Sequence, residues 1–137
     1  MANRLYPKYK EALLGAGVNL ATGTIKAQLV DTGAYTYADT DQFLSAIPAA
    51  ARIGAAVTLA SKTVVGGTFD ADDIAFTSVP AGSGTANAAE AIVIYRDSGA
   101  AASSELIAII DTATGLPITP NGGNVSVTWA AGGIFSL

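Results

Sequence analysis

The chain has 137 residues, of which seven are basic and eleven acidic, so its charged share of 13% is about half that of a typical soluble domain. It contains no cysteine and no histidine, which excludes disulfides, thiolate nucleophiles, cysteine zinc sites and the Ser-His-Asp and Cys-His catalytic systems. The net charge of −4 argues against nucleic-acid binding, because phosphate recognition needs a clustered basic face. The length suits one domain, spanning residues 1–137.

The beginning of the chain predicts one N-terminal α-helix, over about residues 4–16. Pro7 suits the first turn of a helix, and Gly15 and Gly17 supply a stop. Apolar side chains recur at helical spacing at Leu5, Tyr9, Ala12, Leu13 and Ala16. From about residue 23 to residue 137 the pattern changes to period two with frequent turn residues, which predicts a β-rich body.

The first part of this body predicts a half-buried strand over residues 25–30, where apolar and polar side chains alternate. It ends at a turn over residues 31–33. We expect a long excursion over residues 35–52, with one helical turn before Pro48. Further strand regions follow at residues 57–65, ended by Gly66 and Gly67, and at residues 74–79, closed by Pro80 and a Gly/Ser-rich loop to Gly84.

The second part predicts two nearly uninterrupted apolar strands, residues 91–95 and 106–110, covered on both faces. Their connection is too short for a parallel crossover, so they should pair antiparallel. Residues 116–119 and 125–129 predict a hairpin across an Asn-Gly turn, and residues 134–137 predict a closing strand. Together these elements predict a mainly β protein, an antiparallel β-sandwich or squashed barrel with one N-terminal α-helix.

The densest acidic cluster is a candidate cation site. Asp70, Asp72 and Asp73 offer carboxylates of the kind that Ca²⁺ prefers, but no EF-hand continuation follows them, and we favour a polar turn before the next strand. Asp39 and Asp41 form a thinner version of the same pattern. We therefore expect no metal, no cofactor and no catalytic residue.

Three aromatic residues are candidates for a sugar-binding platform: Tyr35, Tyr37 and Trp129. A second interpretation of Trp129 is that it continues the alternation of Val125 and Val127, which favours a position in the core or on a sheet face.

The basic residues are unevenly placed, because Arg4, Lys8 and Lys10 lie within the first ten positions and the rest of the chain nets −7. We expect these side chains either to be solvated on a surface helix or to meet an acidic patch of a neighbouring chain. At the other end, residues 112–137 carry no charge. Low charge and many small side chains suit a subunit whose outer faces pack against neighbours.

Export and membrane signals are weak. The basic start and the apolar run at residues 12–18 imitate a signal peptide, but Glu11 and two glycines interrupt the pattern, so we expect no Sec-type export. The uncharged residues 112–137 contain Pro117, Pro120 and several glycines, which makes a membrane span untenable. We expect a soluble protein with no membrane partner.

Four stretches of the chain resemble small virion proteins of tailed bacteriophages. They are residues 3–14, 25–31, 42–48, and 111–123 continuing through Trp129 to 134–137. The resemblance covers nearly the whole chain, and its motifs are structural rather than catalytic. It implies a virion protein that is made in the cytoplasm of the bacterial host.

The resemblance and the composition together predict a non-enzymatic virion structural protein. We expect a capsid decoration or cement subunit that stabilises the head by bridging neighbouring subunits, with the major capsid protein or other virion proteins as partners and with a symmetric homo-oligomer. Arg4, Lys8 and Lys10 are the expected contact residues. Two alternatives stay open: a tail, neck or fibre-associated virion protein, and a module that binds host glycan.

Overall fold

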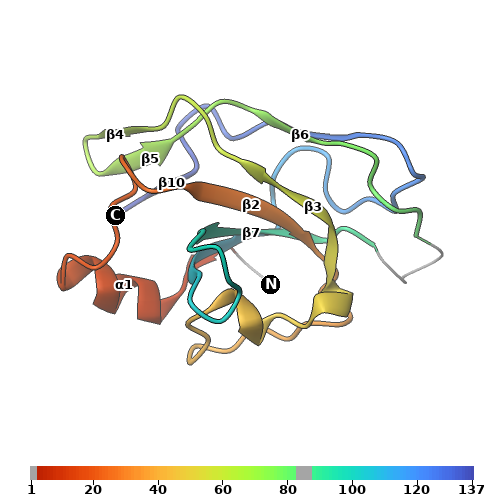
Figure 1. Cartoon of the computed structure of the whole chain (residues 1–137). Helices are drawn as coiled ribbons and strands as arrows, with labels where there is room; N and C mark the ends of the chain where they lie inside the picture. The colour runs from red at the N-terminus through yellow and green to blue at the C-terminus, as the bar shows by residue number, and fades with distance from the viewer. Residues whose placement is uncertain (1–2, 83–87) are drawn as a thin grey trace.

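The computed structural model describes residues 3–82 and 88–137, and this part of the chain is mainly β (Figure 1). Its helices are α1 (Pro7–Leu14) and two short 3₁₀ turns, Leu44–Ala46 and Ala49–Ala51. Its strands are β1 (Arg4–Leu5), β2 (Ile25–Val30), β3 (Arg52–Thr58), β4 (Thr63–Val65), β5 (Thr68–Asp70), β6 (Ile74–Phe76), β7 (Ala91–Arg96), β8 (Glu105–Ile110), β9 (Val125–Val127) and β10 (Phe135–Ser136).

The strands form three antiparallel sheets. The largest has the order β1-β8-β7-β2-β3, and two smaller sheets have the orders β10-β5-β4 and β6-β9. In Figure 1 the smaller sheets form the upper layer over the large sheet, while α1 and the 3₁₀ turns lie below. The predicted β-sandwich with one N-terminal helix is therefore confirmed.

The central hairpin forms as predicted, because β7 and β8 pair antiparallel and nearly all their residues are buried. Strand β2 was expected to be half-buried, and this was wrong: Gln28 is only 5% exposed and Val30 is fully buried. The side-chain amide of Gln28 donates to the main-chain oxygens of Ile53 at 2.8 Å and Gly54 at 3.1 Å. A polar residue in an alternating pattern can thus be buried when the neighbouring strand supplies its hydrogen-bond partners.

The N-terminal helix is shorter than the predicted residues 4–16. Arg4 and Leu5 form β1, which pairs with Ile109 and Ala108 of β8, and the helix starts only at Pro7. Proline in the first turn and the end at Gly15 agree with the prediction. Arg4 and Leu5 join the sheet instead of the helix, because the outer edge of β8 offers hydrogen-bond partners to their main-chain groups. In the first turn of a helix their amides would have no partner within the helix.

The outer edge of β8 is covered by two segments that are far apart in the sequence. Beyond β1, the Tyr6 amide donates to the Ile107 oxygen at 3.0 Å. Further along the same edge, the Leu44 amide donates to Ser104 O at 2.8 Å and the Leu106 amide donates to Gln42 O at 2.9 Å.

The excursion over residues 35–52 has the predicted helical turn before Pro48, followed by a second turn that sequence reasoning missed.

The predicted hairpin between residues 116–119 and 125–129 is wrong. Strand β9 pairs with β6 instead, with Ser126 opposite Ala75, whereas Ile118 forms an isolated bridge with Ala89. Pro117 and Pro120 flank Ile118 closely and lack amide donors, so this segment cannot supply a continuous ladder. Asn121 still makes a turn, in which its side-chain oxygen accepts a hydrogen bond from the Gly123 amide at 2.9 Å.

The strand region predicted at residues 57–65 is two strands, β3 and β4, and β3 begins earlier, at Arg52. Gly66 and Gly67, with φ of 59° and 79°, make the tight turn into β5, a strand that the sequence analysis missed. Strand β6 ends at Phe76 rather than at residue 79. The closing strand is confirmed as β10, which pairs with β5.

Ser83 and Gly84, which belong to the predicted Gly/Ser-rich loop, lie outside the described residues. Within the described ranges, no helix has both the length and the apolar character needed to cross a bilayer.

Candidate interaction surface

An apolar groove of about 330 Å³ lies between α1 and the β10-β5-β4 sheet. One wall is a row of cross-strand neighbours, in which Phe69 on β5 stands between Val64 on β4 and Phe135 on β10. The facing wall is helical, because Tyr9 and Leu13 are four residues apart and lie on one side of α1. The segment that follows the helix closes the groove with residues 18–21.

The deep part of the groove is a packed aromatic cluster. The rings of Phe69 and Phe135 have centroids 5.4 Å apart, and Tyr9 meets Phe135 edge-on at 6.2 Å. Tyr9 and Phe69 are each only 1% exposed. The Tyr9 hydroxyl is buried without a hydrogen-bond partner among the described residues, and burial raises the pKa of this side chain, so it stays protonated at neutral pH.

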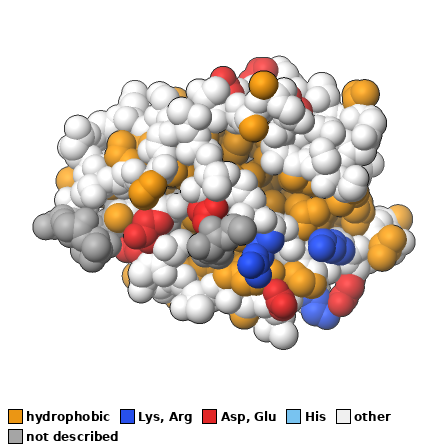
Figure 2. Space-filling model, turned by 180° about the vertical axis from the view of Figure 1, so that it is seen from behind, with side chains coloured by type: hydrophobic (Ala, Val, Ile, Leu, Met, Phe, Trp, Pro, Cys, Tyr) orange, Lys and Arg blue, Asp and Glu red, His pale blue; other side chains and the backbone are white. Residues whose placement is uncertain are grey.

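The mouth of the groove is rimmed by exposed apolar side chains. Val64 and Leu137 line it and are 53% and 70% exposed, and Leu14, which follows the lining residue Leu13, is 90% exposed. The rotated view in Figure 2 brings α1 and the β10-β5-β4 sheet to the right, where hydrophobic side chains gather beside lysine or arginine side chains. An apolar surface with a polar surround is typical of a protein contact site.

The three basic residues expected on the helix do not form one group. Arg4 lies on β1, and its guanidinium stacks over the ring of Tyr37, 4.7 Å from the ring centroid. Lys8 pairs with Glu11 at 2.9 Å on the surface of α1. Lys10 is exposed and takes part in none of the ion pairs among the described residues. Only Lys10 therefore keeps an uncompensated charge on the helix surface.

The structure brings together two of the three residues of the candidate sugar platform, because Tyr35 and Tyr37 both line an open pocket of about 440 Å³, whereas Trp129 does not. Trp129 is 6% exposed, and its indole N–H donates to Asp72 O at 3.1 Å, which confirms its interpretation as a core residue. Tyr35 is 4% exposed and Tyr37 is half-buried beside Arg4. The burial of Tyr35 and Trp129 leaves little of their ring faces for stacking on sugar.

The Tyr35 hydroxyl is held in a buried polar chain. It lies 2.9 Å from the Tyr6 hydroxyl and donates to Oδ2 of Asp41 at 2.7 Å, and this same carboxylate oxygen accepts the Ala38 amide at 3.1 Å. Burial and these hydrogen bonds raise the pKa of Tyr35 far above its ordinary value. The Asp41 carboxylate thus has a structural role as a hydrogen-bond acceptor within the excursion over residues 35–52.

The acidic cluster serves the connection between β5 and β6. Asp70 accepts the Ala71 amide at 2.9 Å, and Asp73 accepts the Trp129 amide at 2.9 Å. Throughout the described ranges, no three acidic side chains are placed to share a metal ion. The carboxylates of Asp70 and Asp73 thus have structural hydrogen bonds, as the polar-turn interpretation predicts, while Asp72 contributes its main-chain oxygen.

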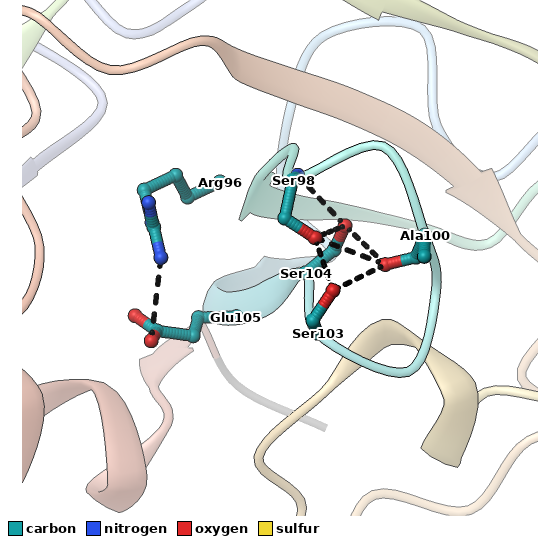
Figure 3. A network of polar contacts seen from close by, with 6 residues as sticks. All are labelled: Arg96, Ser98, Ala100, Ser103, Ser104 and Glu105. Carbon is teal, nitrogen blue, oxygen red and sulfur yellow. Dashed lines mark hydrogen bonds and ion pairs between the residues drawn. The ribbon is translucent and has the colours of Figure 1, made fainter.

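A group of serines closes the β7–β8 hairpin (Figure 3). The Ser104 hydroxyl donates to Ala100 O at 2.8 Å and accepts the Ser98 amide at 3.1 Å, while the Ser98 and Ser103 hydroxyls are 2.6 Å apart. Ser104 is 1% exposed, and the pair Arg96–Glu105 lies next to it on the strands. The hydroxyls are used to fix the loop, which is a structural role.

The uncharged residues 112–137 lie largely on the surface, with Trp129 and the alternate β9 residues Val125 and Val127 turned into the core. The groove itself escaped sequence reasoning, because its walls come from residues 9–21, 64–69 and 135–137. The only local signal of the groove was the pair Val64 and Val65. Two adjacent valines are typical of a buried strand, but both of these are exposed.

Comparison of the chain with protein-family models and with curated proteins found no match.

Proposed function

We propose that the chain is a non-enzymatic structural protein of a tailed-bacteriophage virion, a decoration or cement subunit that bridges neighbouring subunits of the head. The observation that carries this proposal is the apolar face around the groove, where Leu14, Val64 and Leu137 are more than half exposed. In a free monomer such side chains lower solubility, whereas in a lattice they are buried against neighbours.

The remaining surface supports the same role. The chain carries charge on only 13% of its residues, and its exposed C-terminal part, residues 112–137, carries none. Small uncharged side chains are desolvated at little cost, so they suit close packing over a broad contact. The proposed partners are the major capsid protein or other virion proteins, together with further copies of this chain in a symmetric oligomer.

A decoration subunit needs no single strong interaction. A standard interface buries about 1,600 Å² in total, and contacts repeated by symmetry add up across the shell. The proposed place of the protein is the virion, after synthesis in the cytoplasm of the bacterial host.

The test is to locate and count the protein on intact particles. Gold-labelled antibody against the chain should decorate the whole head, and quantitative mass spectrometry should find hundreds of copies per particle. A label confined to the tail, with a copy number that is a small multiple of three or six, would instead place the subunit in the tail or neck. Purified particles without the protein would overturn the virion role.

A further inference from the structure

We propose that the groove between α1 and the β10-β5-β4 sheet receives an apolar segment of a neighbouring protein chain that carries carboxylates beside its apolar side chains. This inference rests on the proposed function, since it names the kind of partner segment that an assembly subunit would hold at this face.

The shape of the groove favours inserted side chains over a flat contact. Its volume of about 330 Å³ lies at the lower end of the range of ligand pockets. Along the row Val64–Phe69–Phe135 exposure falls from 53% at Val64 to 1% at Phe69, so the groove deepens from the β4 edge inward. A segment that lies across β4 can therefore place an apolar anchor against Phe69.

The lining selects an apolar anchor. None of the described lining side chains is charged, and apart from Asn19 and the buried Tyr9 hydroxyl the side chains that form the walls are hydrocarbon. An anchor that carried a charge would be stripped of water without a partner, which is strongly unfavourable.

The basic side chains beside the groove favour acidic residues on either side of the apolar anchor in the bound segment. Lys10 and Leu14 are four residues apart on α1 and form the stripe next to Tyr9 and Leu13, so the free Lys10 ammonium lies beside the groove wall. A second cation is Lys62, whose ammonium donates to the main-chain oxygen of Gly23, two positions beyond the lining residues 18–21. Carboxylates on the partner segment would complement both cations.

The net charge of the whole chain restricts where an acidic partner segment can bind. The chain nets −4, so an acidic partner is repelled by most of its surface and attracted only where cations gather. Lys8, although on the same helix, is already neutralised by Glu11 at 2.9 Å. The proposal thus assigns different roles to two lysines that are two positions apart.

The experiment uses the full chain and two fluorescein-labelled peptides. One has the sequence Asp-Glu-Leu-Phe-Asp-Leu-Glu, and the other replaces each acidic residue with lysine. Fluorescence anisotropy should show binding of the acidic peptide and at least about tenfold weaker binding of the basic one, and a rise in salt from about 0.05 M to about 0.5 M should weaken the acidic complex. Equal binding of both peptides, or no binding of the acidic one, would overturn the proposal.

Two neighbouring valines provide matched variants. Val64 lines the groove and Val65 does not, although both are exposed on the same strand. Val64→Asn should weaken the acidic peptide at least about fivefold, because it removes apolar surface from the contact, while Val65→Asn should stay within about twofold. An equal effect of the two substitutions would overturn the assignment to the groove. Unfolding curves followed by the single tryptophan verify that both variants fold.

The lysines provide a second matched pair. Lys10→Gln should weaken the acidic peptide by about two- to fivefold, and Lys8→Gln should change it less, since that charge is already paired. If Lys8→Gln has the larger effect, the charge assignment is wrong. If Val64→Asn instead abolishes self-association of the chain and the peptide never competes with it, the occupant is a second copy and the proposal fails.

The outcomes separate this inference from the proposed function. Particles that lack the protein, combined with selective peptide binding, would remove the virion role and leave the groove as an acidic-segment site. Particles that carry the protein, combined with absent peptide binding, would keep the virion role and remove the groove from its contacts.

Discussion

The hydroxyl of Tyr35 donates a 2.7 Å hydrogen bond to Oδ2 of Asp41. This bond links two residues six positions apart and stabilises the first part of the excursion over residues 35–52. The Tyr35 hydroxyl also lies 2.9 Å from the hydroxyl of Tyr6, the residue just before α1. These bonds fix the orientation of the Tyr35 ring, which is only 4% exposed.

Tyr35→Phe should destabilise the protein by about 1–3 kcal/mol, since it leaves the Asp41 oxygen and the Tyr6 hydroxyl with one partner fewer in a buried place. Urea unfolding monitored by Trp129 fluorescence measures the loss. Tyr37→Phe is the comparison, because Tyr37 is half-buried and keeps its ring contact with Tyr6 at 5.1 Å. A larger loss for Tyr37→Phe would contradict the importance of the buried chain.

The pair Lys26–Asp97 predicts a specific dependence of stability on pH. The Lys26 ammonium, 2.9 Å away, and the Gly99 amide lower the pKa of Asp97 below its ordinary value of 3.8. Its contribution is therefore complete above pH 3.8 and is lost as the pH falls through the lowered pKa. Asp97→Asn should cost about 0.2–1 kcal/mol of unfolding free energy near pH 7 and progressively less as the pH is lowered below 3.8. Urea titrations at pH 7 and through the acid range measure this, and a cost that does not fall with pH would refute the ion-pair explanation.

Asp73 is predicted to act as a hydrogen-bond acceptor and not as a cation ligand. Asp73→Ala removes the acceptor of the Trp129 amide and should destabilise the protein by about 1–3 kcal/mol, seen in the far-ultraviolet circular dichroism melt. Millimolar Ca²⁺ should leave the melting temperature of the unaltered protein unchanged, because a ligand that binds the folded state raises it. A rise with Ca²⁺ that disappears in Asp73→Ala would revive the cation site.

Charge reversal tests the contact residues on particles. Lys8→Glu combined with Lys10→Glu should lower the occupancy of the protein on the head and the heat resistance of the particles, because both positions lie on the exposed part of α1. Arg4→Gln should act differently: it removes the stacking on Tyr37, costs about 0.5–1 kcal/mol of stability, and leaves occupancy nearly unchanged. Unaltered occupancy after the double reversal would exclude α1 from the contact.

Much of the fold follows from local patterns. The uninterrupted apolar runs of β7 and β8 predicted a buried antiparallel pair, and Pro7 and Gly15 predicted the body of α1. These predictions succeeded because the deciding interactions lie within one turn of a helix or within a single hairpin.

Pairing between distant segments could not be predicted in the same way. The turn at Asn121 suggested a hairpin, yet β9 pairs with β6, about fifty positions earlier. The groove is the same case, because Val64, Phe69 and Phe135 form one row only after β4, β5 and β10 assemble. A sequence pattern shows that a side chain is apolar, whereas its burial depends on which distant neighbours cover it.

The double cover along β8 has a consequence for crowding. Residues 4–6 and 42–44 occupy the outer hydrogen-bonding positions of this strand, so another polypeptide could extend the central sheet there only after two distant segments had both detached. At high protein concentration this edge is thereby protected from the edge-to-edge pairing through which exposed strands form fibrils.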